Sequence, residues 1–343
     1  MQAVKIVGVG QIEVKDVPIP VPGDNEVLVK LKASALCRSD LHLYHGESVF
    51  EDSDIDGSTI TPGHEPCGVV EKVGKNVQSV KPGDRVAVYL AYGCSSCSYC
   101  LAGDTMLCDK FRCMGFDLDG GHADYLVTPE YNCLPLPDEM TFLQGAVSTD
   151  VGGTLYTACR ELGVDGTQTV VIFGIGPMGC GGVLMAKGYG AKVIAIDVDP
   201  QRLKLAQELG ADIVINPKET DSVAEIKRLT KGMGADVAID CTGSQIAQNN
   251  ALDCVKPRGK VGFIGESKSC TINPSDQFIR KLIDLKGLWY FNRADWNEIT
   301  DFIIRNNVAI EKISSHTFPI EEAAEAFKLF DSRVTQKVVF LWD

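Results

Sequence analysis

Four closely spaced cysteines carry the most specific chemical signal in the sequence. Cys94, Cys97, Cys100 and Cys108 follow the pattern C-x2-C-x2-C-x7-C. Thiolates at this spacing can close a tetrahedron around Zn²⁺ with every position filled, which is typical of a structural zinc site and not of a catalytic one. A 4Fe-4S cluster is the chemical alternative, because all-thiolate sets also bind such clusters. The polar sequence around the cysteines favours zinc.

A second group of candidate ligands and proton carriers lies upstream. The segment Cys37-Arg38-Ser39-Asp40-Leu41-His42 places five groups capable of metal, proton or phosphate chemistry within six residues. A capped helix start at Ser39 or Asp40 explains part of this segment, but neither Cys37 nor His42. Further along, His64 and Glu65 follow a Pro-Gly turn and form a plausible pair of metal-binding side chains.

A glycine-rich turn between two apolar runs indicates a nucleotide site. Gly174, Gly176 and Gly179 form G-x-G-x-x-G directly after a predicted strand and at the start of a predicted helix. Backbone amides of such a turn can contact a pyrophosphate at the positive end of the helix. Asp197 ends the next predicted strand, where its carboxylate can hold both adenosine ribose hydroxyls. We therefore predict NAD in preference to NADP; the alternative is a glycine-rich turn that binds nothing.

The elements around these motifs change character along the chain. Residues 1 to about 150 alternate short apolar and polar segments with Pro and Gly turns, which predicts a β-rich region with an acidic surface loop at 46–58. Beyond it, strands alternate with helices, which predicts a doubly wound parallel sheet. The six predicted strands span 170–173, 192–196, 212–216, 235–240, 260–265 and 284–290. Two helices, 296–305 and 320–331, and a strand at 337–341 follow.

Composition limits the classes of partner and location. A chain of 343 residues exceeds the size of a single core, so two domains are expected. The formal net charge of −13 argues against nucleic acid or an anionic membrane as partner. No apolar run approaches the ~18 residues of a membrane span, and the N-terminus lacks the features of a signal peptide. The odd number of cysteines, 13, suggests free thiols and a cytoplasmic location.

The motifs occur in an order that resembles the zinc-dependent alcohol and polyol dehydrogenases of the medium-chain dehydrogenase/reductase family. The resemblance covers essentially the full length and includes C-R-S-D-x-H at 37–42, G-H-E at 63–65, the four cysteines, F-x-x-D-G-G at 116–121 and the glycine-rich turn. It implies an α/β fold with two domains. A GroES-like β-rich catalytic domain would comprise 1–150 and 291–343, and a Rossmann NAD-binding domain with a doubly wound six-stranded parallel sheet would comprise 151–290.

The resemblance also implies a catalytic zinc site. Cys37, His64 and Asp150 would hold the metal, although many relatives have cysteine or glutamate at the last position. Because aspartate is shorter, direct ligation, ligation through water, and replacement by Glu65 all remain open, and Asp150 could instead be a helix N-cap. Asp40 would orient His64, and Ser39 and His42 would carry the alcohol proton to solvent.

Further residues would bind the cofactor by the same resemblance. Arg38 and Lys337 would face the pyrophosphate, Arg202 the adenosine ribose, Thr154 and Met178 the nicotinamide, and the backbone of Ile264, Leu288 and Tyr290 its carboxamide. With Gly174, Gly176, Gly179 and Asp197, these residues make up the predicted NAD site.

The sequence therefore predicts an enzyme that transfers a hydride between a secondary alcohol and NAD, with one catalytic and one structural zinc per chain. Carboxylate-bearing zinc sites in this family go with polyol, sugar and amino-alcohol substrates, which favours a small polyol-like alcohol or ketone as partner. The alternatives are a dehydrogenase of simple primary or aryl alcohols and a protein that binds NAD and zinc without turnover. A metal-free reductase resembling quinone reductases would lack Cys37, His64 and the group of four cysteines. We also expect a homotetramer or homodimer, because the strand at 284–290 would leave an apolar edge in a monomer.

Overall fold

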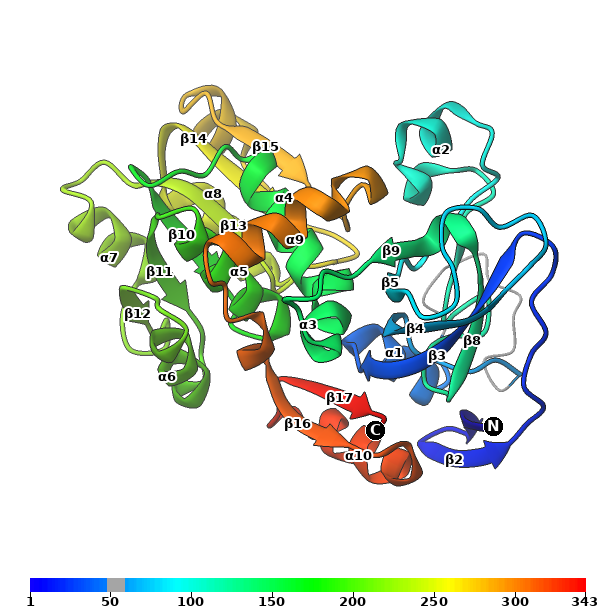
Figure 1. Ribbon diagram of the computed structural model, residues 1–343. Helices are drawn as coiled ribbons and strands as arrows, with labels where there is room; N and C mark the ends of the chain where they lie inside the picture. Colours follow the sequence, from blue (N-terminus) through cyan, green and yellow to red (C-terminus); the bar gives the residue numbers. More distant parts are fainter. Residues whose placement is uncertain (48–58) are drawn as a thin grey trace. The chain divides into compact units, whose positions relative to one another are not determined.

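The computed structural model describes residues 1–47 and 59–343. The chain divides into two compact units, coloured along the sequence in Figure 1. The first contains Met1–Asp150, Phe291–Ile304 and Glu311–Asp343, and the second contains Val151–Tyr290 and Arg305–Ile310. Most of the predicted acidic loop at 46–58 lies outside the described residues. Within the described chain, no helix is both long and apolar enough to cross a membrane.

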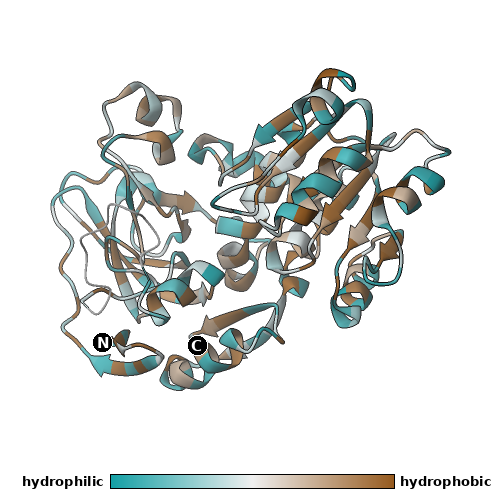
Figure 2. Cartoon of the chain, turned by 180° about the vertical axis from the view of Figure 1, so that it is seen from behind, coloured by the Kyte–Doolittle hydropathy of each residue, from teal (hydrophilic) through white to brown (hydrophobic). Residues whose placement is uncertain are grey.

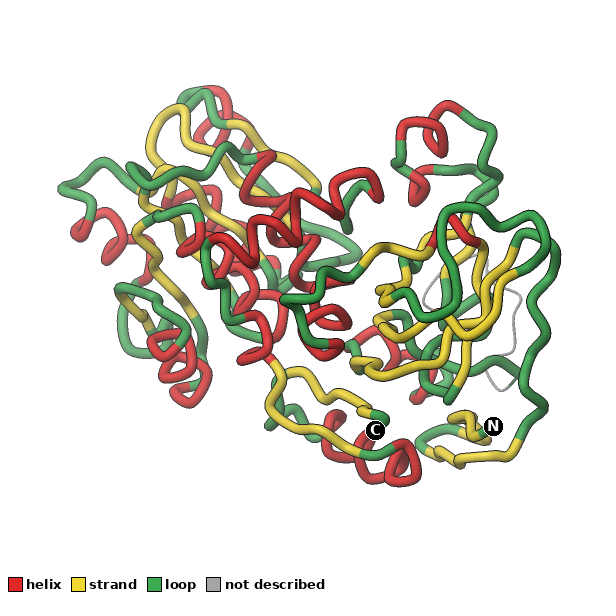
Figure 3. The backbone as a smooth tube through the Cα atoms, viewed as in Figure 1, coloured by secondary structure: helices red, strands yellow, loops and turns green. Residues whose placement is uncertain are grey.

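The first unit is built mainly from strands, drawn in yellow in Figure 3. Its main sheet has seven strands in the order β16-β17-β3-β4-β5-β9, with β8 also paired to β3. All neighbours in this sheet are antiparallel except β16 and β17. The sheet strands are β3 (Glu26–Ala35), β4 (Glu65–Val73), β5 (Arg85–Val88), β8 (Tyr125–Pro129), β9 (Cys133–Pro135), β16 (Ser314–Phe318) and β17 (Lys337–Leu341). The β-rich architecture predicted for this part of the chain is therefore observed.

Smaller elements complete the first unit. They are the hairpin β1 (Gln2–Gly8) and β2 (Gln11–Asp16), the pair β6 (Ala91–Tyr92) and β7 (Arg112–Cys113), and the helices α1 (Arg38–Tyr44), α2 (Ser98–Ala102), α3 (Phe142–Val147), α9 (Trp296–Arg305) and α10 (Ala323–Asp331). Leu41 and Tyr44 of α1 lie one helical turn apart and are buried in one apolar cluster with Phe327 of α10 and Phe340 of β17. This packing fixes the helix that begins directly after Cys37.

The second unit contains the predicted six-stranded parallel sheet. The strand order is β12-β11-β10-β13-β14-β15, and every neighbouring pair is parallel. The strands are β10 (Thr169–Phe173), β11 (Lys192–Ile196), β12 (Ile213–Ile215), β13 (Ala235–Asp240), β14 (Val255–Phe263) and β15 (Asp284–Gly287), and the helices are α4 (Gly153–Glu161), α5 (Pro177–Gly188), α6 (Pro200–Glu208), α7 (Ser222–Leu229) and α8 (Gln245–Cys254). Hydrophobic residues follow the sheet strands, whereas the helices carry both kinds of residue (Figure 2).

Two strands of this sheet differ from the prediction. β14 begins at Val255, earlier than predicted, because α8 leads into it without a loop. β15 ends at Gly287, and Tyr290, predicted as its last residue, has a φ of 60°. A positive φ is incompatible with an extended strand, so the chain leaves the sheet before Tyr290.

The helical segment around Asp150 also differs from the prediction. Thr141 caps α3 with a capping box to Gln144, and α3, a π-helical turn at Ser148–Gly152 and α4 follow one another without a break. Asp150 therefore lies inside a helical segment and not at a helix start. The N-cap alternative for Asp150 is excluded, because the first amides of this segment are satisfied by Thr141.

Candidate functional site

The four cysteines predicted to form a structural zinc site converge in the first unit. Their sulfur atoms all lie within 4.8 Å of one another. Backbone amides support the thiolates: Cys97 N–H donates to Cys94 Sγ at 3.3 Å, and Cys100 N–H donates to Cys97 Sγ at 3.4 Å. Hydrogen bonds from the Ser96 side chain and from backbone amides lower the pKa of Cys94 to about 5. The set offers four soft ligands in a closed arrangement, which fits a structural zinc ion.

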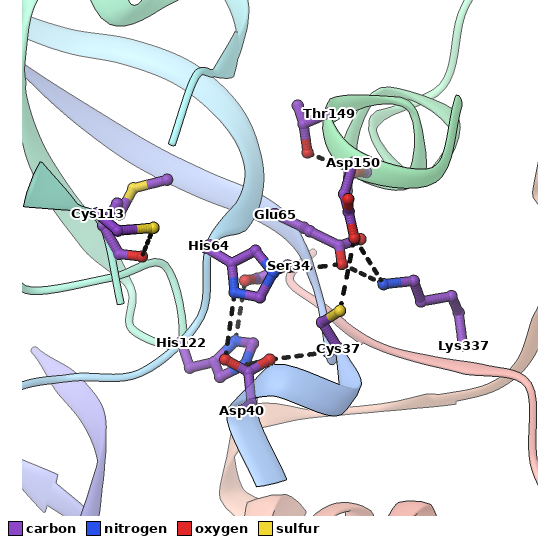
Figure 4. Close-up of polar contacts among 12 residues, drawn as sticks. Ser34, Cys37, Asp40, His64, Glu65, Cys113, His122, Thr149, Asp150 and Lys337 are labelled. Carbon is purple, nitrogen blue, oxygen red and sulfur yellow. Dashed lines mark hydrogen bonds and ion pairs between the residues drawn. The ribbon is translucent and has the colours of Figure 1, made fainter. Parts of the chain in front are cut away.

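A second convergent set combines one thiol, one imidazole and two carboxylates. Ligand atoms of Cys37, His64, Glu65 and Asp150 all lie within 4.8 Å of one another. Cys37 Sγ is 3.5 Å from Asp150 Oδ2, and His64 Nε2 is 3.8 Å from Glu65 Oε1 (Figure 4). Glu65 Oε2 is buried and has no hydrogen-bond partner within the described chain. These donors, together with that orphaned buried oxygen, fit a zinc ion held at this place.

Three different elements of the first unit supply these four side chains. Cys37 precedes α1, where its amide donates to Asp40 Oδ2 at 2.8 Å. His64 directly precedes β4 and Glu65 begins it, and both follow Gly63, whose φ of 101° is open mainly to glycine. Asp150 comes from the π-helical turn, a feature that is frequent at functional sites.

Lys337 lies in this cluster, and the role facing a pyrophosphate that the resemblance implied for it stays a prediction. Its side chain is only 1% exposed, its Nζ pairs with Glu65, and it is 3.5 Å from Asp150 Oδ2. Burial by itself lowers the pKa of Lys337, but Cys37, Glu65 and Asp150 together raise it. Burying an ammonium group costs free energy unless anions lie beside it, which explains the contacts of this lysine with the carboxylates.

The charges in the cluster distinguish its two carboxylates. Burial would raise the pKa of Asp150, but Lys337 and His64 lower it below the usual range. Burial, reinforced by Asp150 and Cys37, raises the pKa of Glu65 despite the contact with Lys337. Lys337 also lowers the pKa of Cys37 against the effect of burial. Asp150 is therefore the more readily ionised of the two carboxyl groups.

Asp40 contacts His64, and it also contacts a second histidine, His122, which the sequence analysis missed. Asp40 Oδ1 is 3.3 Å from His64 Nδ1, the nitrogen that faces away from Glu65. His122 is fully buried, with Nε2 at 3.8 Å from Asp40 Oδ2 and Nδ1 at 2.9 Å from Ser34 Oγ. A signal for His122 was present, because it directly follows the paired glycines of F-x-x-D-G-G.

Ser39 and His42, predicted to carry a proton, lie on α1 together with Arg38, which was predicted to face the pyrophosphate. Arg38 is exposed and Ser39 is partly buried at its first turn. His42 is one turn further along and exposed, and its Nδ1 is 2.7 Å from Glu47 Oε2. The helix therefore leads from the predicted ligand Cys37 to a solvent-exposed imidazole, and the relay role of Ser39 and His42 and the cofactor role of Arg38 stay predictions.

In the second unit, the glycine-rich turn connects β10 to α5. Gly174 has a φ of 83°, and a Cβ atom at Gly179 would clash with the carbonyl oxygen of Gly174, so both positions require glycine. Asp197 Oδ2 accepts a hydrogen bond from the Ile175 amide of this turn at 2.6 Å, and Arg202 Nη1 is 3.9 Å from the same oxygen. The fold thus brings the turn, Asp197 and Arg202 together.

The remaining predicted cofactor residues lie in the same unit. Thr154 is buried in the first turn of α4, and Met178 is partly buried in the first turn of α5. The amides of Ile264 and Leu288 donate to the carbonyl oxygens of Asp240 at 2.9 Å and of Phe263 at 3.0 Å. Because both amides are engaged, only the carbonyl oxygens of Ile264 and Leu288 could bind the nicotinamide carboxamide. The roles of all these residues stay predictions.

Comparisons with known proteins agree with this architecture. A family model for the alcohol dehydrogenase GroES-like domain matches residues 23–138, and one for zinc-binding dehydrogenases matches residues 177–305. The chain is 32% identical to an NAD-dependent alcohol dehydrogenase of Sulfurisphaera tokodaii over 337 residues, covering 95% of each protein. It is 31% identical to an L-threonine 3-dehydrogenase of Xanthomonas oryzae pv. oryzae over 334 residues, covering 97% of this chain and 96% of that protein.

A solved structure gives the same result. The 2R,3R-butanediol dehydrogenase of Bacillus subtilis matches with a TM-score of 0.89 and 26% identity, covering 100% of this chain and 99% of that chain. The predicted α/β fold with a GroES-like part, the oxidoreductase class, and zinc and NAD as cofactors are confirmed by these matches. The chain therefore belongs to the zinc-dependent medium-chain alcohol dehydrogenase family.

Proposed function

We propose that the protein oxidises a secondary hydroxyl group of a polyol, sugar-like or related alcohol with NAD, or catalyses the reverse reduction. The observation that carries this proposal is the ligand chemistry of one cluster, formed by Cys37, His64, Glu65 and Asp150. The cluster offers one soft thiolate and two hard carboxylates, whereas a site with a second thiolate would be softer. Threonine and 2,3-butanediol, named in two of the related proteins, both carry a secondary hydroxyl group.

Cys37, His64 and Asp150 would hold the catalytic zinc, and Glu65 would stay beside it. Lys337 pairs most closely with Glu65, so the positive charge of the lysine offsets that carboxylate. Cys37 and Asp150 then supply two negative charges to a divalent cation, and neutral His64 supplies a nitrogen. This distribution supports direct ligation by Asp150 over replacement by Glu65.

The chain's own residues would position the reaction and move the proton. Bound zinc supplies a Lewis acid that lowers the pKa of a hydroxyl group, and NAD supplies the hydride acceptor. Asp40 would hold the proton of His64 on Nδ1 and leave Nε2 free. The Ser39 hydroxyl would accept the alcohol proton, and His42, oriented by Glu47, would pass it to solvent.

The second unit would bind NAD through the glycine-rich turn. A pyrophosphate would lie against the backbone amides at the start of α5, and Asp197 would accept hydrogen bonds from the adenosine ribose. Arg202, already beside Asp197, would lie against that ribose. The domain assignment follows: 1–150 with 291–343 would be the zinc-binding part, and 151–290 the NAD-binding part.

A panel of alcohols tests the proposal. Zinc-loaded protein would be mixed with NAD or NADP and with polyols, sugar alcohols, amino alcohols, and simple primary and aryl alcohols, and NADH formation would be followed by absorbance. We expect the highest kcat/KM for a secondary hydroxyl in a polar substrate, with NAD. A preference for primary or aryl alcohols would support the simple alcohol dehydrogenase instead. Binding of NAD and zinc without turnover of any substrate would support a binding protein.

We also infer a homo-oligomer and a reducing, cytoplasmic location. β15 is an edge strand of the parallel sheet and is exposed along its length, and Leu282, Leu285 and Trp289 beside it or within it are exposed apolar residues. All thirteen cysteines are free thiols. Light scattering at micromolar concentration that gave a monomer would contradict the oligomer.

A further inference from the structure

His122 occupies a buried position that the proposed chemistry does not yet use. The residue has no exposed surface, and its ring packs edge-on against Phe340 at 5.0 Å and Phe327 at 6.0 Å between ring centroids. Its two nitrogens face polar atoms: Nδ1 faces Ser34 Oγ at 2.9 Å and Nε2 faces Asp40 Oδ2 at 3.8 Å. Burying an imidazole among aromatic rings costs free energy unless polar groups contact its nitrogens.

Backbone hydrogen bonds connect His122 to the loop that carries His64. The amide of Gly121 donates to Gly63 O at 2.7 Å, and the amide of His122 donates to Pro62 O at 3.0 Å. A Cβ atom at Gly63 would lie only 2.5 Å from His122 Nδ1, so the imidazole rests directly on the backbone before His64. The position of His122 is therefore fixed relative to His64.

The groups on either side of His122 determine which of its two nitrogens carries the hydrogen. Burial lowers the pKa of His122, although Asp40 opposes the shift, so the ring is neutral and carries one N–H. A carboxylate only accepts, which places that N–H on Nε2, toward Asp40. Nδ1 then accepts the hydroxyl hydrogen of Ser34.

Three buried atoms converge at the centre of this arrangement. Asp40 Oδ1, His64 Nδ1 and His122 Nε2 have no aligned hydrogen-bond partner within the described chain, although Asp40 lies within 4 Å of both imidazoles. One carboxylate thus contacts two histidines, and Figure 4 shows Asp40 next to His64 and His122. Asp40 Oδ2 also accepts from the Cys37 amide at 2.8 Å, so displacing His122 would leave the carboxylate anchored at that amide but able to turn its other oxygen away from His64.

We propose that His122, held by Ser34, is a positioning residue for the catalytic metal: together with the Cys37 amide it sets the orientation of Asp40, and Asp40 keeps the proton of His64 on Nδ1, so that Nε2 is available as a ligand. This role rests on the proposed function, because it requires a metal at Cys37, His64 and Asp150. The residue does not contact substrate or metal itself. Its loss should therefore change how tightly the metal is held and the geometry of its ligands.

Metal release and cobalt spectra test the proposal without relying on turnover. Zinc-loaded protein would be treated with a chromogenic chelator, and the release phases of the two sites would be followed separately. Cobalt-substituted protein would report the ligand geometry through its visible absorption bands. We expect His122→Phe, which keeps an aromatic ring but no nitrogen, to speed release from the catalytic site roughly tenfold and to alter the cobalt bands.

Three further variants separate positioning from packing. His122→Gln keeps an amide N–H near the place of Nε2 and should restore most of the metal retention. Ser34→Ala should act in the same direction as His122→Phe. Thr128→Val is the matched control for Ser34→Ala, because it also removes one fully buried hydroxyl from a strand of the same sheet, here one that accepts from Tyr92 at 2.8 Å. It should leave both release phases unchanged.

The outcomes distinguish this inference from the proposed function. If unmutated protein binds metal only at the four cysteines, the proposed function is overturned and this inference with it. If the catalytic metal is present but His122→Phe leaves its release rate and cobalt bands unchanged, only the role of His122 is overturned. Should His122→Phe not fold, equal release rates for Ser34→Ala and Thr128→Val would overturn it.

Discussion

Replacing Lys337 with methionine tests the charge balance of the buried cluster. Lys337→Met keeps a long side chain that can fill the same space but removes the only ammonium group that contacts Glu65 and Asp150 in the described site. In the metal-free protein, Cys37, Glu65 and Asp150 would then face one another in a largely buried place with His64 as the only nearby group of the described chain that can carry positive charge. We expect the first unit of the variant to be markedly less stable than that of the parent protein.

The distance between the charged atoms gives the size of the effect. Lys337 Nζ lies 3.5 Å from Asp150 Oδ2, and at an effective dielectric constant of about 20 two unit charges at this distance attract by about 5 kcal/mol. Desolvation of the ammonium group offsets part of this attraction, and breaking a buried ion pair by removing one partner typically costs about 3 to 5 kcal/mol. A loss of about 3 to 5 kcal/mol in the free energy of unfolding is therefore expected without metal. Bound zinc replaces the missing positive charge, so the loss should be clearly smaller in zinc-loaded protein.

The assay is denaturant-dependent hydrogen exchange of peptides from β4 and β17, which report on the first unit alone. Both metal-stripped and zinc-loaded forms of the parent and of Lys337→Met would be compared. The double variant Lys337→Met with Glu65→Gln is the control, because it also removes the acidic group that paired most closely with Lys337 and should regain part of the lost stability. Equal stability of the parent and Lys337→Met without metal, or a loss that zinc does not reduce, would refute the reasoning.

Four further predictions concern the metal sites and the cofactor. Asp150→Asn removes an anionic ligand, so we expect zinc content at the catalytic site and turnover to fall by at least roughly tenfold; unchanged values would move the ligand role to Glu65. Mild chelation should remove one zinc and abolish activity while circular dichroism stays unchanged, whereas first loss from the four-cysteine site with activity intact would reverse the assigned roles. The unmutated protein should prefer NAD by at least about tenfold in kcat/KM, and Asp197→Ser should narrow the gap because it removes charge repulsion toward a 2′-phosphate; equal efficiency with both cofactors would contradict this. In metal-stripped protein, Cys94 should react with iodoacetamide with a pH midpoint near its pKa of about 5, and zinc should protect it; a midpoint near that of an ordinary thiol would contradict the proposed amide support.

Local patterns allowed the sequence to predict much of the fold. The strands Lys192–Ile196 and Ala235–Asp240 have the predicted bounds, because buried strands of a parallel sheet are short apolar runs with clear ends. The four cysteines converge as predicted, because ligand spacing within one loop is itself a geometric constraint. The π-helical turn was not predicted, because Gly152 and Gly153 resemble the start of a new helix. The capping box of Thr141 and Gln144 marks the true start of the helical segment.

The contacts of Lys337 and His122 could not be read from local patterns. Lys337 is 272 residues from Glu65 along the chain, and a lysine in a strand is expected to be exposed. His122 is 88 residues from Ser34, and a single buried histidine is more often a structural residue than part of a metal site. Both contacts depend on the pairing of distant strands, which places β17 beside β3 and β3 beside β4.

The π-helical turn at Ser148–Gly152 has a consequence for the evolution of chain length. Such a turn amounts to an α-helix with one inserted residue, and each residue of an α-helix turns the following ones by about 100°. Deleting one residue here would restore a regular helix, but it would rotate Asp150 away from Cys37 or turn the buried face of α4, with Leu155 and Tyr156, out of its core. We therefore expect a deletion or insertion between α3 and α4 to disturb the site more than substitution of the residues of this turn other than Asp150. Homologues that keep a ligand at this position should be free of insertions and deletions within the turn.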